Sequence, residues 1–472
     1  MLEAQAYAGG CAGSFPYQGY RFDAGATLAG GFQEGGPHAR LAELLDLRWD
    51  LLPVDPAWVV HLPGGMPIAQ WADAAAWEAE HRAAFPGTAG FWDLQRRLAD
   101  ISWDLSRGSL PWPPETGREV LDLATSLRPR HLAALPQLSR RMGDLLPRRD
   151  ARLRAFVDAG LLIAAQCTAD QAGALYGAAA LDLPRRGVAT PRGGMGGIAA
   201  TLVAWIRAQG GQVLFKHRVT RLELAGGRVR GVAAQEGRRG PRRLACDAVL
   251  ANLTPWSLAA LLGEDAPAAL WRQVRGLAPT WGAFMVHLGL DAAALPAGAA
   301  EHHQVVVDLD RPLGEGNSVF LSISPAADAS RAPAGLRAAS LSTHTAVAPW
   351  WRLRGLPDGG AAYEARRQAF AEAMLNAAEG ALPGLRAAVR LRLPATPVTY
   401  AHWTGREAGM VGGFPQGALW HARGPRAGLG RQLANLWQVG DSVFPGQSTA
   451  GVTLGAMRVA RAVLASWSPS GR

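Results

Sequence analysis

Apolar residues recur at two different spacings along this chain, and the spacing predicts which segments are helices. Between residues 119 and 183 they recur at helical spacing with arginines between them, which is typical of amphipathic helices. The same spacing returns at 197–209, and Gly210-Gly211 follows, where a left-handed residue closes a helix. Residues 2–31 are rich in glycine with short apolar pieces, so we expect loops and brief strands around a ligand.

Short apolar or alternating runs predict strands between the helices. A strand is expected at 212–215. A hairpin is expected at 219–224 and 228–234, because Gly226-Gly227 between them suits a tight turn. The run CDAVLA at 246–251 predicts another buried strand. This part of the chain is therefore predicted to be a helix that leads into a sheet, with an antiparallel hairpin inserted between the strands of the sheet.

A second group of strands is expected farther along the chain. Apolar runs occur at 284–290, 302–309 and 318–324, and helical spacing returns at 363–378. These segments predict a second sheet with at least one helix packed against it.

Composition narrows the classes of protein that this pattern fits. Of 472 residues, 49% are hydrophobic and 18% charged, which suits a large folded core and excludes a disordered chain. Charged residues, glycine and proline interrupt each apolar stretch, so a spanning helix and a secretory leader are not indicated. Three cysteines are too few for a disulfide framework and lack metal-site spacing, so we expect no metal.

The net charge of +10 points to an anionic partner. Arginine dominates it, since Lys216 is the only lysine, and the abundance of Arg, Gly, Pro and Ala suggests a GC-rich, bacterial genome. No basic run is interleaved with stacking aromatic residues, so we expect anionic lipid rather than nucleic acid. A solvated basic surface explains the charge equally well.

The C-terminal segment carries the sharpest chemical signal. An apolar strand at 435–439 ends in Gly440 and Asp441, and a glycine-bearing loop leads to a helix that begins near Gly451. Open α/β sheets bind cofactors at the carboxyl ends of their strands, and a helix N-terminus attracts negative charge. The pattern predicts a cofactor site. The alternative is an ordinary strand, turn and helix with an aspartate cap.

Four ordered blocks extend this signal over nearly the whole chain. They are LEAQAYAGGCAGSF with YRFDAGAT, TPRGGMGGIAATLVAWIRAQGGQVLFKHRVTRLELAGGRVRGV, TPVTYAHWTGREAGMVGGFPQ, and VGDSVFPGQSTAGVTLGAMRVARAVL. Together they resemble the phytoene desaturase and carotene isomerase family of FAD-dependent oxidoreductases. The CAGSF loop, LTPW and TGREAGMVGG look closest to the isomerase-like and 3′,4′-desaturase branches.

The resemblance implies an α/β fold of two domains. One is a Rossmann-like FAD-binding domain, and the other is a mixed sheet-and-helix domain that faces the substrate and the membrane. The FAD-binding domain would be discontinuous in sequence. Its expected segments are 1–55, 188–256 and 396–472, and those of the substrate domain are 56–187 and 257–395.

The resemblance also assigns residues to FAD. Glu3 would hydrogen-bond the adenosine ribose, and Val219 would present its backbone to the adenine. Asp441, after Gly440, would contact the ribityl-pyrophosphate region. The other expected contacts, a glycine turn and the N-terminus of the last helix, are Gly9, Gly10, Gly451, Val452 and Thr453.

No residue is identified as catalytic by its sequence context alone. Arg406 and Glu407 lie in the TGREAGM block near the expected flavin face, where they are candidates for substrate positioning or acid–base chemistry. A buried structural ion pair is the alternative. His217 is expected on a sheet surface, and so are His302 and His303, which are adjacent to each other in the sequence.

Tryptophans gather in the region from 41 to 112, and two interpretations of them stay open. Their large apolar rings with one polar N–H suit a membrane-interface belt or a polyene tunnel. Core packing in a helical region explains any single tryptophan. For seven in one region, we expect some to contact the membrane or the polyene. They are Trp49, Trp58, Trp71, Trp77, Trp92, Trp103 and Trp112.

The chain begins close to the expected ribose-binding acid. The family places a strand, a G-x-G-x-x-G turn and a helix before that acid, so roughly thirty residues would precede Glu3. We expect a misplaced start rather than a genuine fragment, because the later blocks look intact. Activity would require the missing segment.

The implied function is FAD-dependent removal of hydrogen from a long polyene, a carotenoid desaturation that could act at the 3′,4′ bond. Oxygen or a quinone would accept the electrons. The alternatives are cis–trans isomerisation of a carotene by reduced FAD without net oxidation, another flavin oxidase acting on amines or lipids, and a flavin-free scaffold. Carotenoids dissolve only in bilayers, so we expect a cytoplasmic protein peripherally associated with the membrane.

Overall fold

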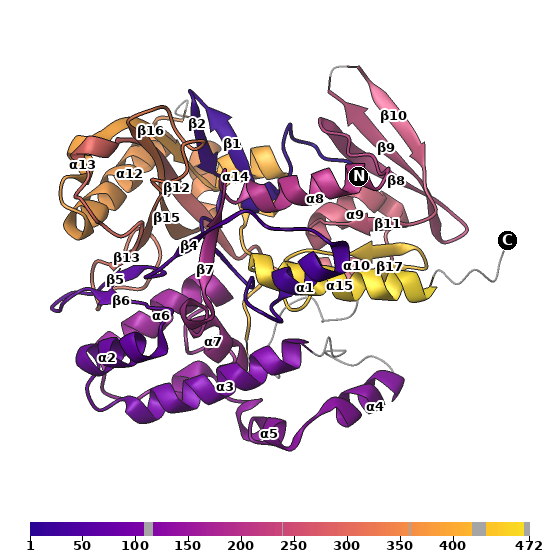
Figure 1. Ribbon diagram of the computed structural model, residues 1–472. Coiled ribbons are helices and arrows are strands. Elements are labelled where there is room, and N and C mark those ends of the chain that lie inside the picture. The colour runs from indigo at the N-terminus through magenta and orange to yellow at the C-terminus, as the bar shows by residue number, and fades with distance from the viewer. Residues whose placement is uncertain (108–116, 238, 358–359, 418–430, 467–472) are drawn as a thin grey trace.

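A seven-stranded sheet is the largest sheet of the molecule (Figure 1). The computed structural model describes residues 1–107, 117–237, 239–357, 360–417 and 431–466. The strand order is β16-β12-β15-β14-β13-β5-β6, and neighbours are antiparallel except β13 and β5. The strands are β5 Val59–His61, β6 Ile68–Ala69, β12 Trp281–Asp291, β13 His302–Val306, β14 Ser318–Ile323, β15 Leu336–Ala346 and β16 Val389–Ala395.

The central strands of this sheet are largely buried, which explains the apolar runs in β12 and β14. Phe284 and Leu288 of β12 share one buried cluster with Leu341 of β15. Met374 and Leu375 of α12 (Ala361–Ala381) complete that cluster from one face of the sheet. The second sheet and its helix are therefore confirmed.

A group of helices lies beside the β5–β6 end of the sheet (Figure 1). Its core contains Trp92, Leu153 and Phe156, and Val306 of β13 joins it from the sheet. The helical spacing predicted between 119 and 183 is confirmed. The helices are α2 Ala74–Ala84, α3 Ala89–Arg107, α4 Gly117–Ser126, α5 Pro129–Leu132, α6 Ala151–Ala165 and α7 Ala174–Leu181.

A smaller group of strands contains the predicted hairpin. Gly226 and Gly227 turn the chain with φ of 58° and 69°, the left-handed values that this two-residue turn requires. A separate parallel pair is formed by β11 and β18, which a short antiparallel strand, β17, extends. The elements are α8 Gly196–Ala208, β8 His217–Ala225, β9 Arg228–Glu236, β10 Pro241–Ala245, β11 Val249–Ala251, β17 Arg431–Leu433, β18 Leu436–Gln438 and α15 Thr449–Ser466.

The strand predicted at 212–215 is reduced to one parallel bridge, in which Leu214 pairs with Leu2. Leu2 packs on the same buried cluster as Ala251 and Leu436. In the part of the chain that the structure describes, no strand joins this bridge to the pair β11–β18. The two parallel pairs thus share a core without sharing hydrogen bonds.

The remaining elements connect these layers. β7 pairs with β3 and β4, and α1 packs against α15. The domain boundaries expected from the sequence stay a prediction. The elements are β1 Ser14–Tyr17, β2 Tyr20–Asp23, β3 Ala29–Gly30, α1 Pro37–Leu45, β4 Leu51–Val54, β7 Val188–Pro191, α9 Pro255–Leu262, α10 Ala268–Arg275, α11 Val347–Arg354, α13 Leu385–Ala388 and α14 Pro397–Thr404.

The expectation that three histidines lie on sheet surfaces is wrong. His302 and His303 are buried on β13, and His217 is buried at the start of β8. Both faces of the seven-stranded sheet are covered. The side chains of His302 and His303 point to opposite faces, and each is buried beside a polar partner. His302 Nδ1 lies 3.0 Å from Ser322 Oγ, and His303 Nδ1 lies 3.0 Å from His61 Nε2.

Several tryptophans of the 41–112 region pack in the helical core, as the simpler interpretation predicted. Trp92 is buried, and Trp58, Trp77 and Trp103 pack against the same cluster. Trp49 instead donates its Nε1–H to the carbonyl of His38 over 2.9 Å. Trp112 lies outside the described residues.

Candidate functional site

Three segments that are far apart in the sequence converge around Cys11. Gly9 and Gly10 have φ of 115° and 55°, and they turn the chain into a short 3₁₀ helix that contains Cys11. Burial is the main cause that raises the pKa of the Cys11 thiol. The nearby charge of Arg406 lowers this pKa, and that of Asp441 raises it. The glycine turn, the TGREAGM block and the C-terminal motif therefore meet at one place.

Arg406 and Asp441 form an ion pair at this meeting point. Arg406 Nη1 lies 3.3 Å from Asp441 Oδ1, Nη2 lies 3.0 Å from Oδ2, and Nε donates to the Met410 carbonyl over 2.8 Å. Their side chains are 16% and 20% exposed. Burial disfavours the charged guanidinium, but Asp441 more than offsets this, so the pKa of Arg406 is raised. Arg406 is charged at any physiological pH.

One donor of this pair has no hydrogen bond to any residue that the structure describes. Arg406 Nη2 is enclosed, and its ion-pair contact lacks hydrogen-bond geometry. A buried guanidinium N–H without an acceptor is costly. It marks a position where an acceptor on a ligand would be stabilised.

Glycines allow the backbone to approach Asp441 closely. A Cβ on Gly413 would lie 2.3 Å from the Asp441 carbonyl oxygen, and a Cβ on Gly440 would lie 2.2 Å from Asn252 Oδ1. Both residues have positive φ, 76° and 102°. Only glycine fits these two positions without a shift of the backbone.

Glu3 and Val219 lie at the same end of the parallel bridge. The Glu3 amide donates to the Leu214 carbonyl, and the His217 amide donates to the Glu3 carbonyl, each over 2.9 Å. Val219 follows on β8, where the register with β9 shifts. Glu3 Oε1 accepts from the Gln5 amide over 2.7 Å. Glu3 is thus hydrogen-bonded to the first residue of β8, two positions before Val219.

The N-terminus of α15 is held by Ser448. Ser448 Oγ accepts from the Gly451 amide and the Ser448 carbonyl accepts from the Val452 amide, each over 2.9 Å. Thr453 Oγ1 lies 3.4 Å from His38 Nδ1 on α1, so this side chain faces a neighbouring helix. Roles for Gly451, Val452 and Thr453 at a flavin stay predictions.

The two candidates in the TGREAGM block separate in the structure. Arg406 turns inward to Asp441, whereas Glu407 is exposed. Ala408, which follows, has φ of 50°, and this left-handed residue turns the chain between them and Met410. Arg406 therefore belongs to the convergent cluster and Glu407 does not.

Buried amides near the site were missed by sequence reasoning. Gln447 Nε2 donates to the Ile163 carbonyl over 3.0 Å, and Gln166 Nε2 lies 3.2 Å from His344 Nε2. A Cβ on Gly412 would fall within 3 Å of both amides. Burial lowers the pKa of His344 to about 4, so its ring is neutral. Gln447 lies inside the C-terminal motif, which was the available signal, but nothing in the sequence marks Gln166.

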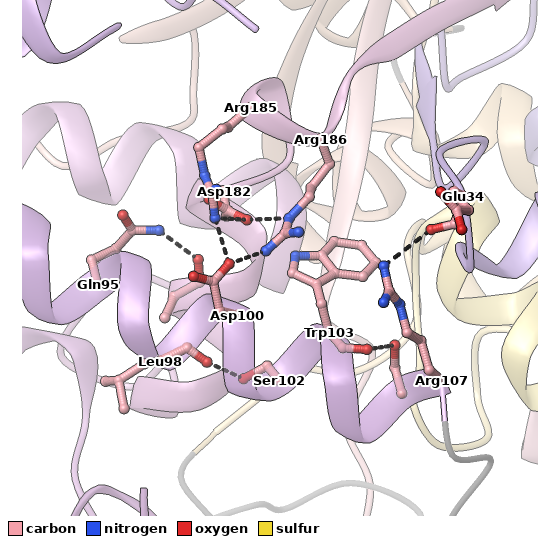
Figure 2. A network of polar contacts seen from close by, with 12 residues as sticks. Glu34, Gln95, Leu98, Asp100, Ser102, Trp103, Arg107, Asp182, Arg185 and Arg186 are labelled. Carbon is pink, nitrogen blue, oxygen red and sulfur yellow. Dashed lines mark hydrogen bonds and ion pairs between the residues drawn. The ribbon is translucent and has the colours of Figure 1, made fainter. Parts of the chain in front are cut away.

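A separate network fixes the helices beside the site. Figure 2 shows Asp100 and Asp182 facing Arg185 and Arg186. Asp182 accepts from Arg185 Nε over 2.6 Å and from Arg186 Nε over 2.7 Å. This network ties α3 to the end of α7. It is a structural feature, distinct from the cluster at Cys11.

The convergent residues fit a flavin dinucleotide. The unused donor on Arg406 suits an acceptor oxygen or nitrogen, and the Asp441 carboxylate suits hydroxyl donors. A Cβ on Gly10 would meet nothing within 4 Å, so there is room beside this turn for a ligand. Glu3 at the end of the parallel bridge suits a ribose hydroxyl.

Comparison with known proteins identifies the family of the chain. A family model of flavin containing amine oxidoreductases matches residues 1–464. The chloroplastic prolycopene isomerase of Arabidopsis thaliana is 28% identical over 495 residues, which cover 98% of this chain and 78% of that protein. The chloroplastic prolycopene isomerase of Daucus carota is 26% identical over 491 residues, with 98% and 76% covered.

Solved structures share the mixed α/β fold over nearly the whole chain. An oxidoreductase from Methanosarcina mazei aligns with a TM-score of 0.63 at 17% identity and covers 98% of this chain and 93% of its own. Cyclohexylamine oxidase from Brevibacterium oxydans aligns with a TM-score of 0.58 at 15% identity, with the same coverage. With the family match over residues 1–464, the chain belongs to the flavin containing amine oxidoreductase family.

Proposed function

We propose that this protein binds FAD and isomerises cis double bonds of a carotenoid polyene. The observation that carries the proposal is similarity to prolycopene isomerases along 98% of the chain. Desaturation, the function first expected from the sequence, has less support, because these relatives are named as isomerases. An amine oxidase activity has support from the description of the family and from the fold of cyclohexylamine oxidase at 15% identity, which is less specific than the full-length similarity to the isomerases.

The proposed roles of the chain's residues follow from the cluster at Cys11. When bound, reduced FAD supplies an electron-rich ring that can exchange charge with a conjugated chain. The turn at Gly9 and Gly10 gives this ring and its tail close approach to the backbone. Arg406 holds a fixed positive charge there, and Asp441 keeps the guanidinium in place.

Product mass separates isomerisation from desaturation. Purified full-length protein would be supplied with FAD, a reductant and prolycopene in detergent micelles, and the products identified by chromatography, absorbance and mass. Isomerisation gives a product of unchanged mass with a shifted spectrum. A product lighter by two hydrogens that forms with oxygen or a quinone as acceptor would establish desaturation instead.

The visible spectrum of the purified protein tests the cofactor first. Bound FAD absorbs in the blue, and a flavin-free scaffold does not. A protein that binds no FAD under any condition would remove the basis for either reaction.

The polyene dissolves in bilayers, so we propose that the protein collects it at a membrane surface. No helix in the described part of the chain is long and apolar enough to cross a bilayer. Association would then be peripheral.

A further inference from the structure

A group of exposed aliphatic side chains lies on α4, α5 and the turn that follows. Val120 is 53%, Leu121 62%, Leu132 54% and Leu135 50% exposed. Large aliphatic side chains scattered singly are ordinary on a surface, whereas four on neighbouring short helices are a candidate interaction site. We call these four residues the aliphatic face.

The interior of the protein leaves this face uncovered. No described residue of α4 belongs to any of the buried clusters. Figure 1 shows α4 and α5 at the edge of the molecule, next to α3 and away from the β8–β10 sheet. The apolar side of α4 therefore has no partner within the described part of the chain.

α5 is fastened to α3 in a way that turns its one leucine outward. His131 is buried, and its Nε2 lies 2.6 Å from Asp104 Oδ2 on α3. Arg130 binds the same carboxylate. Ala134 enters the helical core. With His131 and Ala134 facing inward, the side chain of Leu132 between them is left on the surface.

The segment that carries the aliphatic face has an excess of exposed basic residues. In residues 120–149, the exposed basic residues outnumber the exposed acids Asp122 and Asp144. These basic residues are Arg128, Arg130, Arg141, Arg148 and Arg149. Arginines beside exposed aliphatic residues are the combination that binds an anionic bilayer surface, where the apolar groups enter the acyl boundary and the charges meet headgroups.

A second copy of the chain is a poorer occupant. A symmetric contact through this face would bring the same arginines of both copies together, and like charges repel. An anionic lipid surface satisfies the apolar and the charged groups at once.

We infer that the aliphatic face on α4, α5 and the following turn docks the protein on an anionic lipid bilayer. This rests on the proposed function in so far as the polyene must be collected from a membrane. Docking by two short helices fits a protein whose described helices cannot span the bilayer.

Vesicle co-sedimentation with the full-length protein tests this. One set of vesicles would be pure phosphatidylcholine, and the other would hold roughly one third phosphatidylglycerol. We expect binding to the anionic vesicles that weakens as salt rises. The variant Leu121→Glu with Leu132→Glu should lower the partition coefficient about tenfold or more. Leu44→Glu on α1 is the matched control, because Leu44 is also 62% exposed, and it should bind like the unmodified protein.

Two outcomes would overturn the inference. One is that the double variant binds as well as the unmodified protein, or that Leu44→Glu weakens binding as much as the double variant does. The other is that the unmodified protein ignores both vesicles, including the case of a dimer that the double variant dissociates. The vesicle assay contains no polyene and tests docking alone. Turnover in detergent micelles tests the proposed function, so the two can fail independently. Circular dichroism of the double variant establishes that it is folded.

Discussion

At the scale of single residues, the ion pair between Arg406 and Asp441 has the most direct consequence for the site. Replacing Asp441 by Asn keeps the shape but leaves a buried guanidinium without its counter-charge, which should cost about 3 kcal/mol of stability. We expect a lower melting temperature. We also expect FAD affinity to fall about tenfold or more, because a loss of about 1.4 kcal/mol of interaction free energy changes a binding constant by that factor. Thermal unfolding and a flavin absorbance titration measure both.

Glu407→Gln is the control for Asp441→Asn. It removes a carboxylate in the same block from an exposed position, so FAD binding and melting temperature should stay unchanged. If Glu407→Gln lowers turnover as strongly as Asp441→Asn does, Glu407 takes part in the chemistry. The assignment of Arg406 alone to the site would then be wrong.

Gly413 should be intolerant of any side chain. Alanine there would place a Cβ 2.3 Å from the Asp441 carbonyl oxygen. Gly210→Ala is a matched control, because Gly210 has a similar φ of 79° but open space around it. The control should cost about 1 kcal/mol for the left-handed backbone, and Gly413→Ala about 2 kcal/mol more. Urea unfolding of both variants measures the difference, and equal losses would contradict the packing argument.

At the scale of elements, the network at Asp182 holds the helices beside the site. Asp182 is 3% exposed and binds two arginines, so Asp182→Asn should destabilise the protein by about 3 kcal/mol. Asp100 contacts the same arginines but is 53% exposed, so Asp100→Asn should cost less than about 1 kcal/mol. Chemical unfolding compares them, and a larger loss for Asp100→Asn would refute this account.

Elements also show where sequence patterns were sufficient. Mostly apolar runs predicted β12 and β14, because a strand buried on both faces carries apolar residues at most positions. Helical spacing predicted α6 and α7 for the corresponding reason. The strand at 212–215 was overestimated, because a strand exists only where a neighbour pairs with it, and only Leu214 has one.

At the scale of the whole molecule, buried neutral histidines make stability depend on pH. Burial lowers the pKa of His38 and of His287 to about 4, below the ordinary value of 6.5. Between these values the unfolded chain binds protons that the folded protein does not. Stability is therefore full above about pH 6.5 and falls as the pH drops toward 4, by up to about 1.4 kcal/mol per unit for each such histidine.

His287→Phe isolates one histidine from this total. His287 contacts the rings of Phe15 and Phe22, and its Nδ1 has no partner in the described part of the chain. A phenyl ring should fit and remove one proton from the pH dependence. Urea unfolding between pH 4.5 and 7.5 should give a shallower slope for the variant. An unchanged slope would show that His287 does not contribute.

The sequence by itself determined the sheet and helix segments, the glycine turns, the C-terminal cofactor motif and the resemblance to FAD-dependent carotenoid enzymes. These properties depend on neighbouring residues, and local spacing records them. The tertiary structure alone decided which distant residues meet. It paired Arg406 with Asp441, exposed Glu407, and buried His302 and His303. It also left the aliphatic face of α4 and α5 without a partner among the described residues. Such contacts depend on how layers pack, and local sequence does not encode which surface a neighbouring layer will cover.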